Sequence, residues 1–236
     1  MSIHIEYKGR TGNNIFQYVF ARIIAENNNL SISAKCPPIL TPQDLRQGST
    51  IKTPSVTVND DNASDFIDKK GLRSRINIKG FFQNRKLYTD RKRIQSFFKL
   101  EGSKNTDDIV AHVRIGDYKT WRKGVVISPS WYHNILKSET FNRLFFVTDE
   151  PKSSFFHSFR DYNPTIISSS HKNDFHFIRN FDKILCSNST FCWWAAFLST
   201  ATKLYMFKNW VFRKGPHKYV DLVPIEGALI RDGKFC

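Results

Sequence analysis

An arginine and an aspartate directly follow a short apolar stretch near the middle of this chain. Residues 109–113, apolar except for His112, suit a buried β-strand, and Arg114, Gly116 and Asp117 come next. Ligands of open α/β sheets bind beyond the carboxyl ends of the strands. At that position a cation can bind an anionic group and a carboxylate can accept a proton. The other interpretation is a strand that ends in an ordinary polar turn.

Strand-like and helix-like segments alternate from residue 109 onward. Strands are predicted at 109–113, 144–147, 165–167, 183–186 and 203–207, and helices at 130–137, 151–159, 174–181 and 189–198. Strands separated by helix-length segments need crossover connections, so this half is predicted to be a doubly wound parallel sheet of an α/β protein.

Polar residues follow most of these strands, and the carboxyl ends of parallel strands share one edge of a sheet. They are Thr148, Asp149 and Glu150, then Ser168 to Ser170, then Ser187, Asn188, Ser189 and Thr190. The last group opens a helix, where free amides and small hydroxyls can form an anion site; a plain N-cap is the commoner and compatible interpretation. Trp193 and Trp194 in that helix are expected in the core, not as a ligand platform.

The amino-terminal part begins with a predicted strand at 3–7, a turn at 8–14 and a helix at 15–26. Gly9 and Gly12 allow backbone to approach a ligand, although the turn lacks both the dinucleotide fingerprint and the Walker lysine. Residues 27–62 are predicted as mostly loop, with short strands near 30–33 and 56–58. A helix at 63–69, a strand at 76–79 and a basic helical region up to residue 100 follow.

Two domains and a tail are predicted from this pattern. The polar segment 101–107 contains Gly102 and is the candidate linker. It separates a reduced, basic domain at 1–104 from a domain at 105–214, and residues 215–236 are expected to pack back on the body as a tail. A chain of 236 residues, 40% of them hydrophobic, is long enough to bury a sizeable hydrophobic core.

Positive charge is concentrated in one stretch of a chain whose net charge is +15. Residues 69–104 hold twelve lysines and arginines against two acidic residues. Such a patch suits nucleic acid, an anionic membrane or a phosphorylated substrate, and a solvated basic face is the commoner interpretation for most of its side chains. Phe81, Phe82, Phe97 and Phe98 come in adjacent pairs that favour core packing over base stacking.

No apolar run reaches the roughly 20 residues that cross a bilayer, and the first residues suit a strand, not a signal peptide, so a cytoplasmic protein is predicted. The four cysteines lack metal-ligand spacing and are expected to be free thiols, with Cys186 and Cys192 buried. The chain contains no Asp-x-Asp pair.

Four ordered blocks resemble motifs of the family 11 glycosyltransferases, the α-1,2-fucosyltransferases. Residues 9–18 are similar to G-x-x-G-N-Q-x-F-Q-Y and residues 80–83 to G-[YF]-[FW]-Q. Residues 112–118 are similar to H-x-R-R-G-D-Y, and residues 187–196 to N-S-[ST]-F-S-W-W-A-A. Four blocks in the same order make this resemblance far more specific than any single motif.

The resemblance implies a GT-B-like pair of Rossmann-like domains and inverting transfer of fucose from GDP-fucose to a glycan hydroxyl, the 2-OH of a galactose-type residue. It implies no metal and no cofactor. By position, Arg114 would hold the donor diphosphate. The implied donor-binding set is Arg10, Gly12, Asn13, His112, Arg114, Asp149, Ser187, Asn188, Ser189, Thr190 and Phe191, and the implied catalytic set is His112, Arg114 and Asp117.

Ile115 departs from the family motif, which has a second arginine there. The related protein O-fucosyltransferases tolerate isoleucine and carry an Arg-x-Gly-Asn opening like residues 10–13, so Arg10 is hypothesised to compensate.

Four residues are candidates for the general base that accepts the proton of the acceptor hydroxyl: Asp117, Asp149, Glu150 and His112. Asp117 is favoured because it shares a loop with Arg114; Asp149 could instead contact the nucleoside, and His112 could be a satisfied core histidine. A non-catalytic nucleotide or glycan binder and a basic nucleic-acid-binding module are the alternative functions, and peripheral contact with an anionic membrane is a further expectation.

Overall fold

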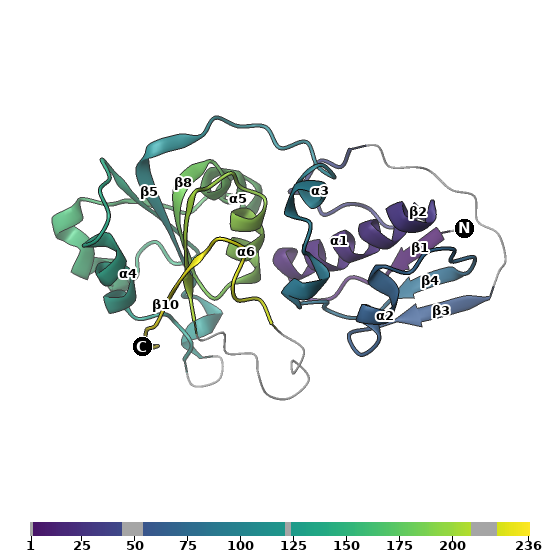
Figure 1. Ribbon diagram of the computed structural model, residues 1–236. Helices are drawn as coiled ribbons and strands as arrows, with labels where there is room; N and C mark the ends of the chain where they lie inside the picture. The colour runs from purple at the N-terminus through teal and green to yellow at the C-terminus, as the bar shows by residue number, and fades with distance from the viewer. Residues whose placement is uncertain (1, 44–53, 121–123, 209–220) are drawn as a thin grey trace. The chain divides into compact units, whose positions relative to one another are not determined.

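The computed structural model describes residues 2–43, 54–120, 124–208 and 221–236 (Figure 1). These residues divide into two compact units. The first holds those up to Leu100 together with Asp221, and the second holds those from Glu101 to residue 208 and from Leu222 to Cys236. The predicted boundary follows residue 104, whereas the chain divides after Leu100. Part of the predicted tail, 215–220, lies outside the described residues.

The first unit is built on a parallel sheet with the strand order β2-β1-β4-β3. Its strands are β1 (Ser2–Ile5), β2 (Ser31–Ile32), β3 (Ser55–Val58) and β4 (Arg75–Ile78), and its helices are α1 (Thr11–Asn28), α2 (Ala63–Ile67), the 3-10 turn η1 (Arg85–Leu87) and α3 (Arg91–Gln95). Helix α1 joins the parallel pair β1 and β2, and α2 joins the pair β3 and β4, as parallel strands require.

Helix α1 begins four residues earlier than predicted, so Gly12 and Asn13 lie in its first turn and not in a loop. The Asn14 N–H donates to the Arg10 carbonyl at 3.0 Å, which closes that turn. Weak helix formers at 12–14 hid the start from a propensity argument. The helix ends at Asn28, and the next residue, Asn29, has a φ of 54°, the left-handed conformation common at helix ends.

Aromatic rings fill the core of the first unit. Phe20 stacks on Phe82 with ring centroids 4.1 Å apart, and Tyr88 donates from its hydroxyl to the Phe82 carbonyl at 2.8 Å. Phe97 and Phe98 are buried as well, whereas Phe81 is half-buried. Core packing is therefore confirmed for three of the four phenylalanines in the two predicted pairs.

The second unit contains a six-stranded parallel sheet, which confirms the predicted α/β class (Figure 1). Its strands are β5 (Asn105–Val113), β6 (Leu144–Thr148), β7 (Thr165–Ile167), β8 (Phe181–Cys186), β9 (Lys203–Phe207) and β10 (Leu229–Arg231). The helices are α4 (Pro129–Leu136), α5 (His171–Arg179) and α6 (Thr190–Phe197), with 3-10 segments η2 (Asp117–Lys119) and η4 (Ser154–Tyr162).

The strand order is β10-β9-β8-β5-β6-β7. Counted along the chain from β5, this is the order 3-2-1-4-5-6 of a Rossmann-like sheet. The chain reverses direction across the sheet between β5 and β8, which are hydrogen-bonded neighbours. Ligands of such sheets bind at the carboxyl ends of these two strands.

Two layers of helices cover this sheet, with α4 on one side of β5 and β8 and with α5 and α6 on the other (Figure 1). Ala111 and Val113 belong to the core that contains Trp131 and Tyr132 of α4. On the opposite face, Phe145 of β6 contacts Phe177 of α5 at 5.4 Å between ring centroids. Side chains of one strand alternate between faces, so His112 lies on the face covered by α5 and α6.

Three predicted elements of the second unit need correction. Residues 154–162 form a 3-10 helix where an α-helix was predicted at 151–159, and the Phe156 N–H donates to the Ser153 carbonyl at 3.3 Å, an i to i+3 bond. Strand β5 begins at Asn105, inside the predicted linker. The predicted tail contains β10, which pairs with β9 at the edge of the sheet.

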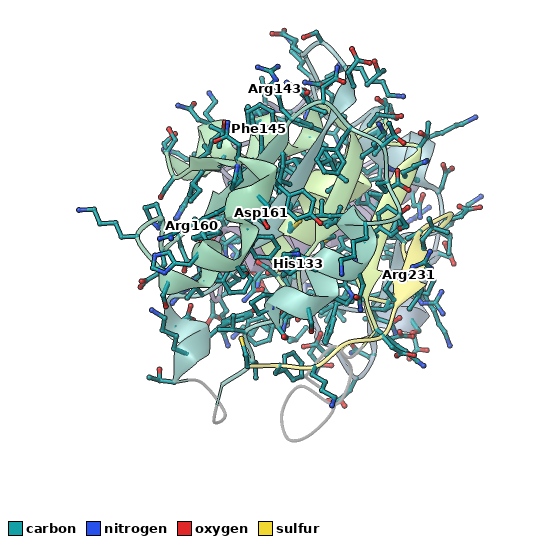
Figure 2. All side chains as sticks on the ribbon, turned by 90° about the vertical axis from the view of Figure 1, so that its left-hand side faces the viewer. His133, Arg143, Phe145, Arg160, Asp161 and Arg231 are labelled. Atoms are coloured by element: carbon teal, nitrogen blue, oxygen red, sulfur yellow. The ribbon has the colours of Figure 1, made fainter. Side chains whose placement is uncertain are left out.

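An ion pair connects β5 and β6 near the amino end of this sheet, between Asp108 of β5 and Arg143, the residue before β6. Arg143 Nη2 lies 2.8 Å from Asp108 Oδ2, and the Arg143 guanidinium lies 5.2 Å from the Phe145 ring. Figure 2 labels Arg143 and Phe145 at the edge of this unit. The guanidinium holds the pKa of the Asp108 carboxyl below its usual value. This pair is structural and lies at the end of the sheet opposite to the predicted site.

Burial agrees with the sequence interpretation of the remaining special residues. Trp193 and Trp194 are fully buried, and Cys186 and Cys192 are buried free thiols. Among the helices of the described residues, none has both the length and the apolar character to cross a membrane.

Candidate functional site

His112 and Ser187 meet at the point where the strand order reverses. His112 is the next-to-last residue of β5, and Ser187 directly follows β8. The His112 Nδ1 lies 2.6 Å from the Ser187 Oγ, and both side chains are buried. The ring of Phe191, in the first turn of α6, lies 5.7 Å from the imidazole. Residues near the ends of β5 and β8 therefore lie together at one edge of the sheet, as predicted, although 75 positions separate His112 and Ser187 in the sequence.

Burial decides the protonation of His112. It lowers the pKa of the imidazole from 6.5 to about 4, and the nearby Asp149 carboxylate opposes the shift only in part. The ring is therefore neutral at pH 7, and its bond to Ser187 is that of a satisfied core histidine. A neutral imidazole with so low a pKa is a poor proton acceptor, so its burial and its contact with Ser187 favour a positioning role for His112.

This low pKa makes the stability of the protein depend on pH. The unfolded chain protonates His112 below about pH 6.5 and the folded chain only below about pH 4, so the unfolded state binds more protons between these values. We expect this residue to remove about 3 kcal/mol from the free energy of unfolding as the pH falls through that window. Urea unfolding of the wild type and of His112→Gln at several pH values measures the difference in slope; equal slopes would contradict the assignment.

Arg114 lies between two carboxylates. Its Nη2 is 2.6 Å and its Nε 3.1 Å from Asp117 Oδ1, and its Nη1 is 2.9 Å from Asp149 Oδ2. The side chain of Arg114 is 19% exposed, compared with 43% for Asp117 and 26% for Asp149. The guanidinium thus sits at the surface of the site, with the more exposed of its two partners on the loop that follows β5.

Asp149 holds this loop in place. Besides its ion pair with Arg114, its Oδ1 accepts a hydrogen bond from the Ile115 N–H at 2.9 Å. A Cβ added at Gly116 would collide with the same carboxylate, so a side chain at position 116 would force Asp149 to move. Asp149 was predicted to lie with Arg114 at the strand ends, and the two side chains are in direct contact. Both partners of the Asp149 carboxylate, Arg114 and Ile115, belong to the loop that follows β5.

Ile115 packs into the core. It is 2% exposed and belongs to the cluster that holds Val113, Trp131 and Tyr132. In this protein, position 115 therefore supplies packing and not a contact to the site. Arg10 lies in the first unit at the N-cap of α1, and its proposed compensation for a missing arginine stays a prediction.

Tyr118 connects the Arg114 loop to the start of α6. Its ring lies 5.8 Å from the Arg114 guanidinium, and its hydroxyl donates to the Asn188 carbonyl at 3.1 Å. The Asn188 Nδ2 donates to the Val125 carbonyl at 3.0 Å, while its buried Oδ1 has no hydrogen-bond partner among the described residues.

Ser189 is the N-cap of α6 without a capping side-chain bond, and Thr190 is the first helical residue. Backbone amides at this helix start suit an anion.

Glu150, the fourth candidate base, pairs with a lysine instead of the guanidinium. Lys119 Nζ lies 3.2 Å from Glu150 Oε2, and the Glu150 N–H donates to Thr148 Oγ1 at 3.2 Å. The four candidate bases therefore differ in their contacts, and Asp117 is the exposed carboxylate that touches Arg114.

The first unit brings together two of the sequence blocks at the carboxyl ends of β1 and β4. Gln83 Nε2 donates to Asn13 Oδ1 at 2.8 Å, although 70 residues separate them. The buried Gln17 holds the preceding loop, because its side chain bonds both the N–H and the carbonyl of Lys8. Gly9 has a φ of 77° and leaves room for the Asn13 side chain.

Asp60 was missed by sequence reasoning and fixes the second of these blocks. Its carboxylate accepts hydrogen bonds from the Phe81 N–H at 2.9 Å and the Phe82 N–H at 2.5 Å. A Cβ on Gly80 would meet the same carboxylate, and Phe82 adopts a φ of 54°. An aspartate in a polar loop gives no sequence signal for this role, since its partners lie 21 and 22 residues away.

Metal-ligating residues do not gather in the described part of the chain: no group of three or more His, Cys, Asp or Glu side chains there could hold a metal ion. A scan against models of known protein families and a search of curated proteins find no match to this chain.

Proposed function

We propose that this protein is an inverting glycosyltransferase of GT-B-like architecture that moves fucose from GDP-fucose to a glycan hydroxyl, the 2-OH of a galactose-type residue. One observation carries the proposal: an arginine stands at the carboxyl end of β5, linked through Tyr118 to a helix start at the switch point of a Rossmann-like sheet. Such a site is suited to a nucleoside diphosphate.

The arrangement of the four sequence blocks supports the proposal. In the first unit, residues 9–18 and 80–83 are joined by the hydrogen bond between Asn13 and Gln83. In the second unit, residues 112–118 and 187–196 are joined by the contact between His112 and Ser187. Blocks that resemble motifs of one enzyme family thus pair at strand ends, the usual place for ligands in such sheets.

The chemistry follows from the charges. When the bond between the fucose C1 and the phosphate oxygen breaks, negative charge grows on the GDP diphosphate. Arg114 and the first amides of α6 would stabilise that charge, as donors do in an oxyanion hole. The acceptor oxygen forms the new bond to C1 from the opposite face, which inverts the configuration, and its proton passes to a base. The proposal assigns the base to Asp117.

The ion pairs of Arg114 support this division of roles. A diphosphate that binds the guanidinium competes with its carboxylate partners, and the more exposed Asp117 is the easier one to displace. Asp149 also holds the Ile115 N–H and would stay to position the loop. Displacement would leave Asp117 beside the diphosphate with a carboxylate ready to accept a proton.

GDP is expected to stabilise the protein, because a ligand that binds only the folded state adds to the free energy of unfolding. At about 100 times its dissociation constant the gain is about 2.7 kcal/mol, and the melting temperature should rise by roughly 5 to 10 °C. Thermal melts with GDP, ADP and short DNA measure this. Stabilisation by ADP or DNA but not by GDP would contradict the proposal and would favour the nucleic-acid alternative.

Incubation of labelled GDP-fucose with a panel of glycans tests transfer itself. Label should appear in acceptors with a terminal galactose-type residue, at an unchanged rate in excess EDTA, because an arginine and helix amides take the charge that a metal would otherwise carry. A clear drop with EDTA would show that a metal takes part. Stabilisation by GDP without any transfer would favour a non-catalytic binder.

A further inference from the structure

Positive side chains gather at the amino edge of the sheet in the first unit, far from the strand ends that carry Asn13 and Gln83. Three of them lie in the connection from α2 to β4, one begins β4 and three lie on α3. This basic cluster consists of Lys69, Lys70, Arg73, Arg75, Arg91, Lys92 and Arg93.

Two asparagines at the end of α1 hold the segments of the basic cluster together. Asn28 donates to the Lys69 carbonyl at 2.8 Å and accepts from the Leu72 N–H at 2.9 Å. Asn27 Oδ1 accepts from Arg93 Nη2 at 2.8 Å, while its Nδ2 donates to the Ile67 carbonyl at 2.8 Å. The connection to β4 and helix α3 therefore meet at the last turn of α1.

The topology of the sheet places that turn. Helix α1 leaves the carboxyl end of β1 and returns to the amino end of β2, which is parallel to β1. Its last turn therefore lies at the amino edge, where Arg75 begins β4. The proposed transfer uses the opposite edge and leaves the basic cluster without a role.

Most of the basic cluster is open to solvent. Lys69, Lys70, Arg73, Arg75 and Lys92 are exposed, and Arg91 and Arg93 are half-buried. The carboxylates closest along the chain are Asp65, Asp68 and Asp90, and Asp90 accepts the Arg93 N–H as the cap of α3. Glu26 in the last turn of α1 is a fourth carboxylate at this edge, and it pairs with Arg22 at 2.7 Å. Seven cations against these carboxylates leave a positive surface.

We propose that the basic cluster docks the protein on an anionic phospholipid surface. Charge complementarity selects the partner, and half-buried Phe66 and Leu72 place apolar groups among the cations, with the Lys69 ammonium 5.1 Å from the Phe66 ring. Single-stranded nucleic acid needs aromatic rings on which bases can stack. Phe66 is the one aromatic residue between residues 63 and 75, and the Lys69 ammonium already lies over its ring, so this ring is not open for a base to stack on. A bilayer at this edge leaves the opposite edge, with Asn13, open to ligands.

Vesicle flotation tests this docking without any sugar nucleotide, so its outcome is independent of the proposed transfer. The full chain should float with vesicles of phosphatidylcholine and phosphatidylglycerol and not with phosphatidylcholine alone. Binding should fall between about 0.1 M and about 1 M NaCl, because the Debye length shortens from about 10 Å to about 3 Å.

The combined variant Lys69→Gln, Lys70→Gln and Arg73→Gln should weaken partitioning by about 10- to 100-fold. Its matched control is Lys137→Gln, Lys152→Gln and Lys172→Gln, which removes three exposed charges from the second unit and should leave partitioning nearly unchanged. Equal losses in the two variants would mean that net charge alone acts and would overturn the proposal. Binding of a single-stranded oligonucleotide in place of anionic vesicles would overturn it in favour of nucleic acid.

Discussion

Replacing Arg114 by alanine is expected to lower fucose transfer by about 10³-fold or more while the fold is retained. Loss of one oxyanion donor costs about 10² to 10³ in rate, and loss of a guanidinium at a phosphoryl group costs about 10³ to 10⁵. The side chain belongs to an ion-paired group with Asp117 and Asp149 at the strand ends and not to the apolar core, so the fold should survive its removal. Steady-state kinetics with GDP-fucose, together with thermal melts, separates the two effects.

Arg231→Ala is the matched control for this change. Arg231 is an exposed residue of β10 in the same unit and is labelled in Figure 2. Its guanidinium lies 5.5 Å from the Tyr205 ring, much as that of Arg114 lies 5.8 Å from the Tyr118 ring. Its loss should leave the rate unchanged. Arg114→Lys should recover only part of the activity, because lysine keeps the charge and loses the planar fork. A fully active Arg114→Ala enzyme would remove the donor role from this residue.

The order of the site loops could be read from the sequence because hydrophobic periodicity is strong in the second unit. Strands β7 and β9 have the predicted bounds, Thr165–Ile167 and Lys203–Phe207, and polar residues follow β5, β6 and β8 as expected. Short apolar runs between helices leave few alternatives to a buried parallel sheet. The order of the strands within that sheet could not be predicted, because the contact of β5 with β8 depends on tertiary packing, which no local pattern encodes.

Three features escaped prediction because their causes are not local. Strand β10 lies close to Pro224 and Gly227, residues that indicate turns and hide a short strand from a sequence pattern, and it pairs with β9. Helix α1 includes Gly12 and Asn13 because the buried Gln17 ties down the preceding loop. Asp149 reaches Ile115 across 34 residues of chain, so its positioning role is visible only in three dimensions.

Replacing Asp117 by asparagine is expected to lower kcat by about 10² to 10⁴, the usual contribution of a general base. The same change should not raise the KM for GDP-fucose. In the structure the Asp117 carboxylate occupies Arg114 at 2.6 Å, so a neutral amide competes less with the diphosphate. A fall in kcat with an unchanged or lower donor KM is therefore the expected signature, and it differs from that of Arg114→Ala, which should also weaken donor binding.

Two further variants make this prediction specific to the base. Asp232→Asn removes an exposed carboxylate that pairs with Lys208 at 3.1 Å in the same unit, and it should leave both constants unchanged. Asp149→Asn should weaken donor binding, since Asp149 positions Arg114 through its ion pair and through the Ile115 N–H. If Asp117→Asn kept full activity while Glu150→Gln lost it, the proton acceptor would be Glu150, and the role of Asp117 would be limited to its ion pair with Arg114.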